Sequence, residues 1–217
     1  MDKKFFERVF SEKRLAKYFS RYDNDTEQAM THYRCNVELS EAFYPSISTF
    51  EIALRNAISR ELSVLFGRED WYAVFATTAG LTSLNKYISQ ANKQIAGRKE
   101  YVTPSKIIAE LTLGFWVSLF NVEYERVLWK DLRRVFPNMP KTERQRKNIA
   151  PYLNRFRTFR NRVFHNEPIT WNLEKASKIH SEMLTVMNWI NKDIPLWIGT
   201  FDRFDVVYQK IERELNA

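Results

Sequence analysis

An arginine, an asparagine and a histidine lie close together in residues 159–169, which read FRNRVFHNEPI. Arg160 and Asn161 are adjacent, and His165 follows Asn161 by four positions. A histidine can exchange a proton near neutral pH, and an arginine can stabilise negative charge that develops on phosphoryl oxygens. Because RNA supplies its own nucleophile, the 2′-hydroxyl, these residue types predict acid–base cleavage of a phosphodiester without a metal ion.

The same three residues also permit a purely structural interpretation. A histidine at a helix end can cap free carbonyl groups, and an arginine can form an ion pair between two helices. The motif is short, so its residue types alone leave both interpretations open.

The motif is predicted to lie at the end of a helix over residues 142–165. Thr142 and Gln145 have the spacing of a capping box, and Pro168 lies just beyond the predicted end. On an ideal helical wheel, the apolar residues of this segment form one stripe about 120° wide. The stripe consists of Ile149, Tyr152, Leu153, Phe156, Phe159 and Val163.

Arg160 falls inside this apolar stripe. A guanidinium on the core-facing side needs a carboxylate, a bound anion or a cleft open to phosphate, because its desolvation is otherwise costly. Asn161 and His165 share one side of the helix, and Arg157 continues their row. On a straight helix Arg160 and His165 point roughly 140° apart. They converge only if the helix distorts near its end or if a second copy of the chain supplies the partner.

A second polar group lies in residues 50–60, which read FEIALRNAISR within a long predicted helix. Glu51 and Arg55 are four residues apart, and Asn56 follows directly. Glu51 lies on the apolar face of this helix. It is therefore expected either to form a local ion pair with Arg55 or to reach across the core to Arg160.

The charge of the chain favours a polyanionic partner. The formal net charge is +8 and the pI is near 9.5, and each Lys or Arg that contacts a phosphate releases a condensed counterion. Arg155 and Arg162 project away from the apolar stripe, so we expect them to be solvated and to bind RNA. An ordinary basic surface is the alternative.

The composition predicts an all-α fold. Hydrophobic residues make up 44% of the chain, and only five glycines and seven prolines interrupt it. Pro45 is expected in the first turn of the long helix and Gly67 at its end, and Thr26 is expected to cap a further helix. About eight helices are predicted, over residues 3–20, 40–66, 81–96, 103–120, 122–136, 142–165, 171–190 and 202–215. We expect an N-terminal helical extension over residues 1–38 and one helical domain over residues 39–217, packed as a single unit.

Several functional classes are disfavoured by what the sequence lacks. Cys35 is the only cysteine, so neither an intramolecular disulfide nor a thiolate metal cluster can form. HExxH, GxSxG and glycine-rich phosphate loops do not occur, and no metal or cofactor is expected. No apolar run approaches the ~20 residues of a membrane span, and the charged N-terminus does not resemble a signal peptide. A cytoplasmic protein without a membrane partner is expected.

The other histidines and the tryptophans are expected to be structural. His32 and His180 have no neighbouring catalytic residue types in the sequence. Five tryptophans occupy positions typical of helical cores rather than of base-stacking platforms. They are Trp116, Trp129, Trp171, Trp189 and Trp197.

The motif resembles the arginine–polar–x₃–histidine signature of HEPN-domain ribonucleases. More specifically, the chain resembles the Abi-like abortive-infection proteins, the group that includes AbiD and AbiF. The resemblance is carried by five ordered blocks: LSEAFYPSISTFEIALRNAI at 39–58, FGREDW at 66–71, ELTLGFWVSLF at 110–120, YERVLWKDLRRVFP at 124–137 and FRNRVFHNEPI at 159–169.

The resemblance implies a HEPN-type helical bundle that forms a two-fold homodimer, so that two Arg–His pairs meet in one cleft. It implies a metal-independent endoribonuclease that acts in phage defence or as a toxin, with RNA as substrate. The resemblance also implies a companion noncoding RNA or an antitoxin as a further partner. Arg160, Asn161 and His165 would be catalytic, whereas the supporting residues would be Glu51, Arg55, Asn56 and Arg157.

Two positions depart from related proteins. Many relatives carry a second histidine where this chain has Asn166, which predicts weaker proton transfer here. HEPN toxins silenced by tyrosine adenylylation carry a tyrosine where this chain has Glu167, so that mode of control is not expected. The sequence leaves two alternative functions open. One is a non-catalytic HEPN module that binds RNA or protein, and the other is a purely structural helical partner.

Overall fold

The computed structural model describes residues 1–216 as an all-α protein. Within these residues, twelve α-helices and five short 3₁₀-helices form the regular structure, and no strand occurs. The predicted all-α class is therefore confirmed, whereas the described residues contain more helices than the eight predicted. Ala217, the last residue of the predicted unit 39–217, lies outside the described residues.

The elements follow one another with short connections. They are α1 (Lys3–Phe10), α2 (Glu12–Arg21), α3 (Thr26–Ala42), α4 (Tyr44–Phe66), η1 (Trp71–Ala76), η2 (Thr82–Leu84), α5 (Asn85–Gly97), α6 (Pro104–Glu110), α7 (Leu113–Ser118), η3 (Val122–Tyr124), α8 (Glu125–Leu132), η4 (Arg133–Val135), α9 (Arg146–Phe164), η5 (Thr170–Asn172), α10 (Leu173–Ile190), α11 (Asp193–Ile198) and α12 (Phe204–Asn216).

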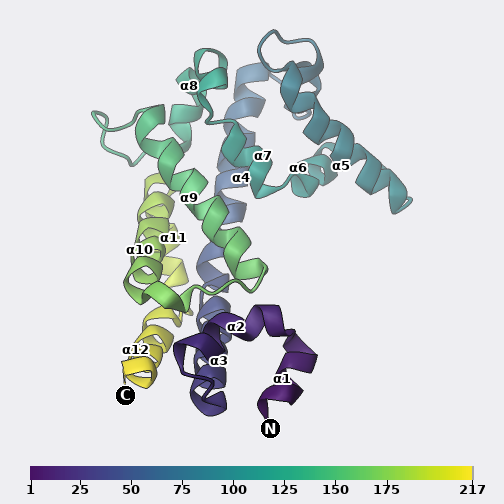
Figure 1. The fold of residues 1–217 in the computed structure, drawn as a ribbon. Helices are drawn as coiled ribbons and strands as arrows, with labels where there is room; N and C mark the ends of the chain where they lie inside the picture. Colours follow the sequence, from purple (N-terminus) through teal and green to yellow (C-terminus); the bar gives the residue numbers. More distant parts are fainter. Residues whose placement is uncertain (217) are drawn as a thin grey trace.

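The long helix α4 is the central element. It runs from the N-terminal helices at one end of the molecule towards α8 at the other, and α10 packs along it (Figure 1). Pro45 lies in its first turn, and Gly67 ends it in the left-handed conformation with φ 65°, as predicted. The predicted start at residue 40 is wrong, because α3 continues to Ala42 and α4 begins only after the buried Phe43.

The segment predicted as one helix over residues 3–20 is two helices. Ser11 has a φ of 72°, and its hydroxyl accepts a hydrogen bond from the backbone N–H of Arg14 at 3.4 Å. A serine that caps a new helix interrupts the apolar periodicity without any proline or glycine. The cap of α3 is Asp25 rather than the predicted Thr26, because the Asp25 carboxylate accepts from the Gln28 N–H at 3.0 Å.

Two further helix boundaries differ from the prediction. The segment 103–120 divides into α6 and α7, because Leu111 and Thr112 are extended. Its predicted start is confirmed, since the Thr103 hydroxyl caps α6. The predicted capping box at Thr142 is wrong, because α9 begins only at Arg146 and has no side-chain cap.

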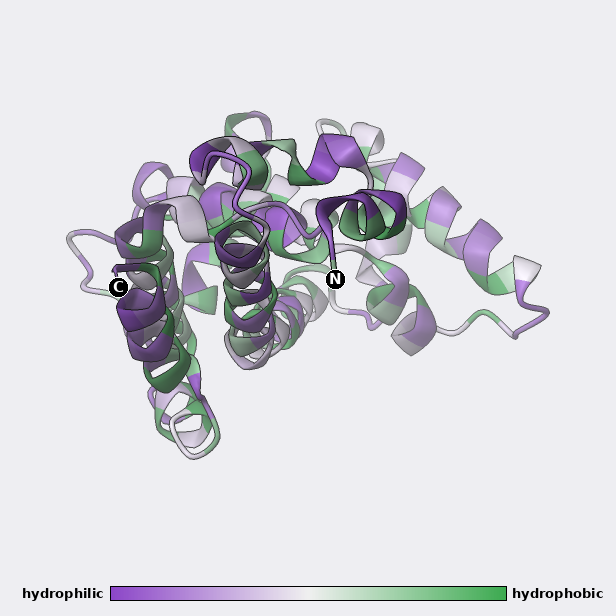
Figure 2. Ribbon diagram, turned by 60° about the horizontal axis from the view of Figure 1, so that its bottom comes forward, coloured by the Kyte–Doolittle hydropathy of each residue, from purple (hydrophilic) through white to green (hydrophobic). Residues whose placement is uncertain are grey.

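The apolar residues form two clusters. The larger one surrounds α4 and includes the buried faces of α9 and α10. The smaller one lies among α2, α3 and η5 and consists of Leu15, Tyr18, Phe19 and Ala29, with Trp171 packed against it. Most helices carry a hydrophobic and a hydrophilic face (Figure 2), so burial of one face accounts for their packing.

Candidate functional site

The helices α4 and α9 run in opposite directions and meet through aromatic side chains and one ion pair. The Phe43 ring, just before α4, lies 4.6 Å from that of Phe159, and the Phe50 ring lies 5.2 Å from that of Phe156. Later residues of α4 therefore face earlier residues of α9. The apolar stripe predicted for α9 is buried in the core that α9 shares with α4, α7 and α10, apart from the half-buried Tyr152.

Arg160 and Glu51 form an ion pair at this crossing. The Arg160 Nε donates to the Glu51 Oε1 at 2.8 Å, and both side chains are about two-thirds buried, with 33% and 27% exposed. The guanidinium carbon also lies 4.2 Å from the centre of the Phe164 ring, within cation–π distance. The predicted cross-core partner of Arg160 is therefore present. The alternative local pair is absent, because the Arg55 Nε donates to the Asn56 Oδ1 at 3.1 Å instead.

A cleft of about 850 Å³ opens beside this ion pair. Its walls come from α4, α6, α7 and α9. It is lined by Ser48, Glu51, Ile52, Arg55, Ala109, Glu110, Leu111, Thr112, Leu113, Gly114, Trp116, Arg157, Thr158, Arg160, Asn161, Arg162 and Glu167. Of the nine residues proposed from the sequence, six line this cleft, whereas Asn56, Arg155 and His165 do not.

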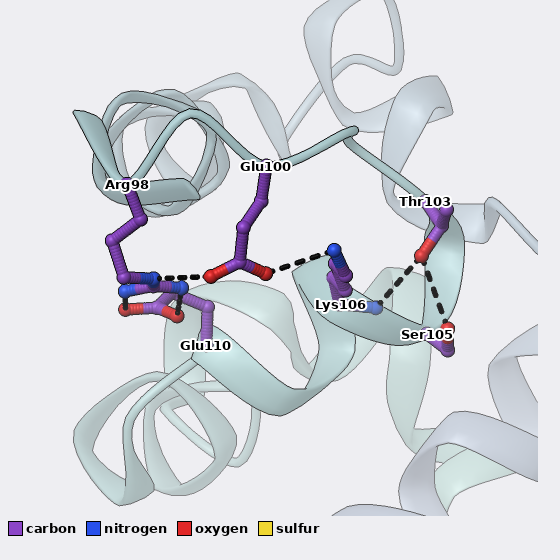
Figure 3. A network of polar contacts seen from close by, with 6 residues as sticks. All are labelled: Arg98, Glu100, Thr103, Ser105, Lys106 and Glu110. Carbon is purple, nitrogen blue, oxygen red and sulfur yellow. Dashed lines mark hydrogen bonds and ion pairs between the residues drawn. The ribbon is translucent and has the colours of Figure 1, made fainter. Parts of the chain in front are cut away.

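The wall contributed by α6 is fixed by an ionic network (Figure 3). Arg98, just after α5, donates to both carboxylate oxygens of Glu110, with distances of 3.2 and 2.6 Å. Glu100 bridges Arg98 and Lys106 at 2.9 and 2.8 Å. The network ties the end of α5 to α6, and Glu110 is held by an arginine that does not itself line the cleft.

His165 lies beyond the helix end and outside the cleft lining. Its backbone N–H still donates to the Asn161 carbonyl at 2.9 Å, so α9 keeps its regular path to this point. The chain then reverses through Asn166, whose φ is 52°, while the Glu167 N–H donates to the Arg162 carbonyl at 2.8 Å. The helix therefore does not distort in the way that would bring Arg160 and His165 together within one chain. The His165 side chain is exposed and forms no hydrogen bond within residues 1–216.

The segment after His165 is held by the N-terminal helices. Arg14 donates to the Asn166 carbonyl at 2.9 Å. The Asn36 Oδ1 accepts from the N–H groups of Ile169 and Thr170 at 2.6 and 3.3 Å. Helices α2 and α3 thus set where the chain emerges from α9, a role for which the sequence offered no signal.

The two arginines predicted to bind RNA are not free. Arg155 forms an ion pair with Glu182 at 2.9 Å, although its side chain is 40% exposed. Arg162 pairs with Glu167 at 3.3 Å and also donates to the Pro168 carbonyl. Both side chains are partly exposed, in agreement with their predicted position away from the apolar stripe, but each is also paired with a carboxylate outside α9, which a helical wheel does not identify. RNA binding by these two arginines stays a prediction.

The other two histidines are structural, as predicted. His32 is buried, with Nδ1 2.9 Å from the Tyr22 hydroxyl and Nε2 3.0 Å from the Thr170 hydroxyl. Burial, together with the charge of Arg21, lowers the pKa of His32 from 6.5 to about 4. His180 is buried, 2.8 Å from the Asp202 carboxylate, and is stacked on the Phe204 ring at 4.0 Å.

One tryptophan contradicts the prediction of a core position. Trp197 is 59% exposed and packs against Phe201 at 4.8 Å. Both residues line an apolar groove of about 630 Å³, which shares Ser48 and Ile52 with the cleft. The helix α11 that carries Trp197 was not predicted, because it has only six residues.

Neither a metal cluster nor a membrane span is found in the part of the chain that the structure describes. Residues 1–216 contain no group of three His, Cys, Asp or Glu side chains placed to hold a metal ion. In the same residues, no helix combines the length and the apolar character that crossing a bilayer requires.

Comparisons with known proteins give one match. No curated protein and no solved structure matches the chain. The family model described as Abi-like protein matches residues 3–172, which span α1 to η5 and include the whole cleft and His165. The match covers most of the chain, so the protein belongs to the Abi-like protein family, and this membership suggests a role in abortive infection.

Proposed function

We propose that this protein is a metal-independent endoribonuclease of the HEPN class, which arrests growth by cleaving RNA during phage defence. The observation that carries the proposal is how the Arg160 guanidinium is held and where it lies. Glu51 holds its Nε inside a cleft of about 850 Å³, while its two terminal nitrogens form no hydrogen bond within residues 1–216. An arginine oriented in this way presents a free pair of donors to a phosphoryl group.

The proposed reaction uses the 2′-hydroxyl of RNA as nucleophile. The 2′-oxygen attacks the adjacent phosphorus, the bond to the 5′-oxygen breaks, and the products are a 2′,3′-cyclic phosphate and a 5′-hydroxyl. One His165 accepts the proton of the 2′-hydroxyl, and another donates a proton to the leaving 5′-oxygen. Arg160 stabilises the charge on the phosphoryl oxygens, and Asn161 orients the histidine or the substrate.

Two copies of the chain are required by this mechanism. Arg160 lies in the cleft, whereas His165 is exposed beyond the end of α9 and outside the cleft lining. A two-fold dimer that joins the ends of two α9 helices would bring the histidine of one copy towards the arginine of the other. The exposed Phe164 ring, 46% accessible, lies between the two residues in sequence and favours burial in such an interface.

The decisive experiment is incubation of the purified protein with total RNA in the presence of EDTA. The wild type is expected to cleave RNA and leave 2′,3′-cyclic phosphate ends, whereas His165→Ala is expected to be inactive. Lys192→Ala, an exposed residue at the start of α11, is the matched control and should retain full activity. Intact RNA with the wild type, or equal cleavage by His165→Ala, would refute the proposal.

Mixing the wild type with an inactive variant tests the dimeric site. Because the proposed reaction uses the His165 of both copies, a mixed dimer of wild type and His165→Ala lacks one proton-transfer group and is expected to be inactive. After subunit exchange, an equal mixture should keep about a quarter of the activity of the same total amount of wild type, since a quarter of the dimers carry two wild-type copies. Retention of half of that activity, together with mixed dimers demonstrated by mass spectrometry, would show that each site uses the histidine of a single copy.

Growth measurements test the cellular role. Induced expression of the wild type is expected to arrest growth, and Arg160→Ala and His165→Ala should each relieve the arrest. Equal arrest by the wild type and both variants would exclude RNA cleavage at this site as its cause.

A second candidate function is a non-catalytic HEPN module that binds RNA. It is favoured by the absence of any hydrogen-bond partner of the His165 side chain within residues 1–216. This alternative predicts salt-dependent RNA binding that survives His165→Ala, with the RNA recovered intact.

A further inference from the structure

The carboxylates that line the cleft all have ion-pair partners, whereas two of its arginines do not within residues 1–216. Three carboxylates line it, and each is held by an arginine. Glu51 pairs with Arg160 at 2.8 Å, and Glu167 pairs with Arg162 at 3.3 Å. Glu110 is held from outside the lining by Arg98 in the network of Figure 3. No carboxylate of the cleft is therefore left to neutralise a further cation.

Two arginines of the lining remain without a carboxylate. Within residues 1–216, neither Arg55 nor Arg157 forms a salt bridge, and the only hydrogen bond of either guanidinium joins the Arg55 Nε to Asn56. Both side chains are half-buried. Two half-buried cations in one cleft repel each other, and within residues 1–216 only the hydrogen bond to Asn56 offsets their desolvation.

The crossing of α4 and α9 places these two arginines on the same side of the ion pair. Arg55 lies one turn after Glu51 on α4, and Arg157 lies one turn before Arg160 on α9. Because the two helices run in opposite directions, both steps lead the same way along the cleft, by about 5 Å each. A nucleic-acid strand with one phosphate at Arg160 would bring its next phosphate towards Arg55 and Arg157.

We propose that Arg55 and Arg157 form a binding subsite for the phosphate adjacent to the scissile one, in single-stranded RNA. The assignment rests on the proposed function for the identity of the scissile phosphate, but the subsite itself rests on the unpaired charges. Because Glu51 already neutralises the charge of Arg160, Arg160 adds little net attraction for the RNA substrate before it reacts. The subsite thus provides substrate affinity, whereas Arg160 acts on the charge that develops during the reaction.

The test measures binding of an RNA that cannot be cleaved. A fluorescent 2′-O-methyl oligonucleotide lacks the nucleophile, so anisotropy reports affinity independently of catalysis. Arg55→Gln and Arg157→Gln are each expected to raise Kd about tenfold and to reduce the slope of log K against log salt by about 0.7. Arg60→Gln is the matched control, because Arg60 lies on α4, is exposed and does not line the cleft.

A second measurement separates binding from catalysis and from folding. At saturating cleavable RNA, both variants should keep kcat within about threefold of the wild type, since the effect lies in ground-state binding. Their melting temperatures should equal or exceed that of the wild type, because each substitution removes one of two repelling charges. Variants that unfold would contradict the unpaired state of these arginines.

Distinct outcomes identify which proposal fails. Binding that depends on Arg55 and Arg157 without any cleavage by the wild type would overturn the proposed function and leave the subsite standing. Affinities and salt slopes equal to those of Arg60→Gln would overturn the subsite, whether or not RNA is cleaved. Competition by poly-glutamate as effective as that by RNA would also overturn it, and would indicate an acidic protein segment as the ligand.

Discussion

Two polar clusters adjoin the end of α9, and they differ in whether their polar groups have hydrogen-bond partners. In the cluster around His32, both ring nitrogens have hydrogen-bond partners and the imidazole is 1% exposed. In the cleft, the terminal guanidinium nitrogens of Arg55, Arg157 and Arg160 have no protein acceptor among residues 1–216.

The difference shows where chemistry can occur. A histidine whose nitrogens are both satisfied in a buried site stabilises the fold but cannot exchange protons with a substrate. Groups that remain unsatisfied in an open cleft are available to a ligand. Substitutions in the cleft should therefore change activity more than stability, and substitutions around His32 should do the reverse.

The largest expected effect is on catalysis. Arg160→Ala removes the donors that face the phosphoryl group, and the single-turnover cleavage rate should fall by about 10²- to 10³-fold. The free energy of unfolding should change by only about 1 kcal/mol, because the pair with Glu51 is one-third exposed. A cleavage rate within tenfold of the wild type would place the reacting phosphate elsewhere.

The largest expected effect on stability comes from the cluster around His32. Asn36→Ala leaves the buried N–H groups of Ile169 and Thr170 without their acceptor, at a cost of about 3 kcal/mol in the free energy of unfolding. Urea denaturation measures this loss. Asn188→Ala, at an exposed position of α10, is the control and should lie within about 0.5 kcal/mol of the wild type. Equal stabilities of the two variants would contradict the role of Asn36.

The pH dependence of stability should report on His32. Its pKa is about 4 in the folded protein and near 6.5 when unfolded, so between these values only the unfolded chain binds the proton. Stability is retained above pH 6.5 and falls as the pH decreases towards 4, by up to about 3 kcal/mol from this residue. His32→Gln should show a shallower decrease over the same window, and parallel pH profiles would exclude the effect.

The smallest effect concerns the reversal that follows His165. Asn166 has a φ of 52°, so Asn166→Ala should destabilise the fold by about 1 kcal/mol, whereas Asn166→Gly should be nearly neutral. Thermal unfolding of the two variants measures the difference. An alanine variant as stable as the glycine variant would mean that this turn relaxes, and the position of His165 would then not be set by it.

Local features of the fold could be predicted from the sequence because they depend on neighbouring residues. The apolar stripe of α9, the first turn of α4 at Pro45 and the end of α4 at Gly67 all follow from helical periodicity and backbone preference. The break at Ser11 was missed, although a serine before Glu12 has the form of a helix cap. Apolar spacing continues across such a break and hides it.

The sequence by itself determined that Arg160 requires an anionic partner, because its place in the apolar stripe follows from α9 alone. Only the tertiary structure decided that Glu51 is this partner and that Arg155 and Arg162 are paired. It also decided that Arg55 and Arg157 form no salt bridge within residues 1–216. Each of these outcomes depends on the angle and direction at which distant helices cross. Helical periodicity fixes the side of a helix on which a residue lies, but only packing determines what stands opposite to it.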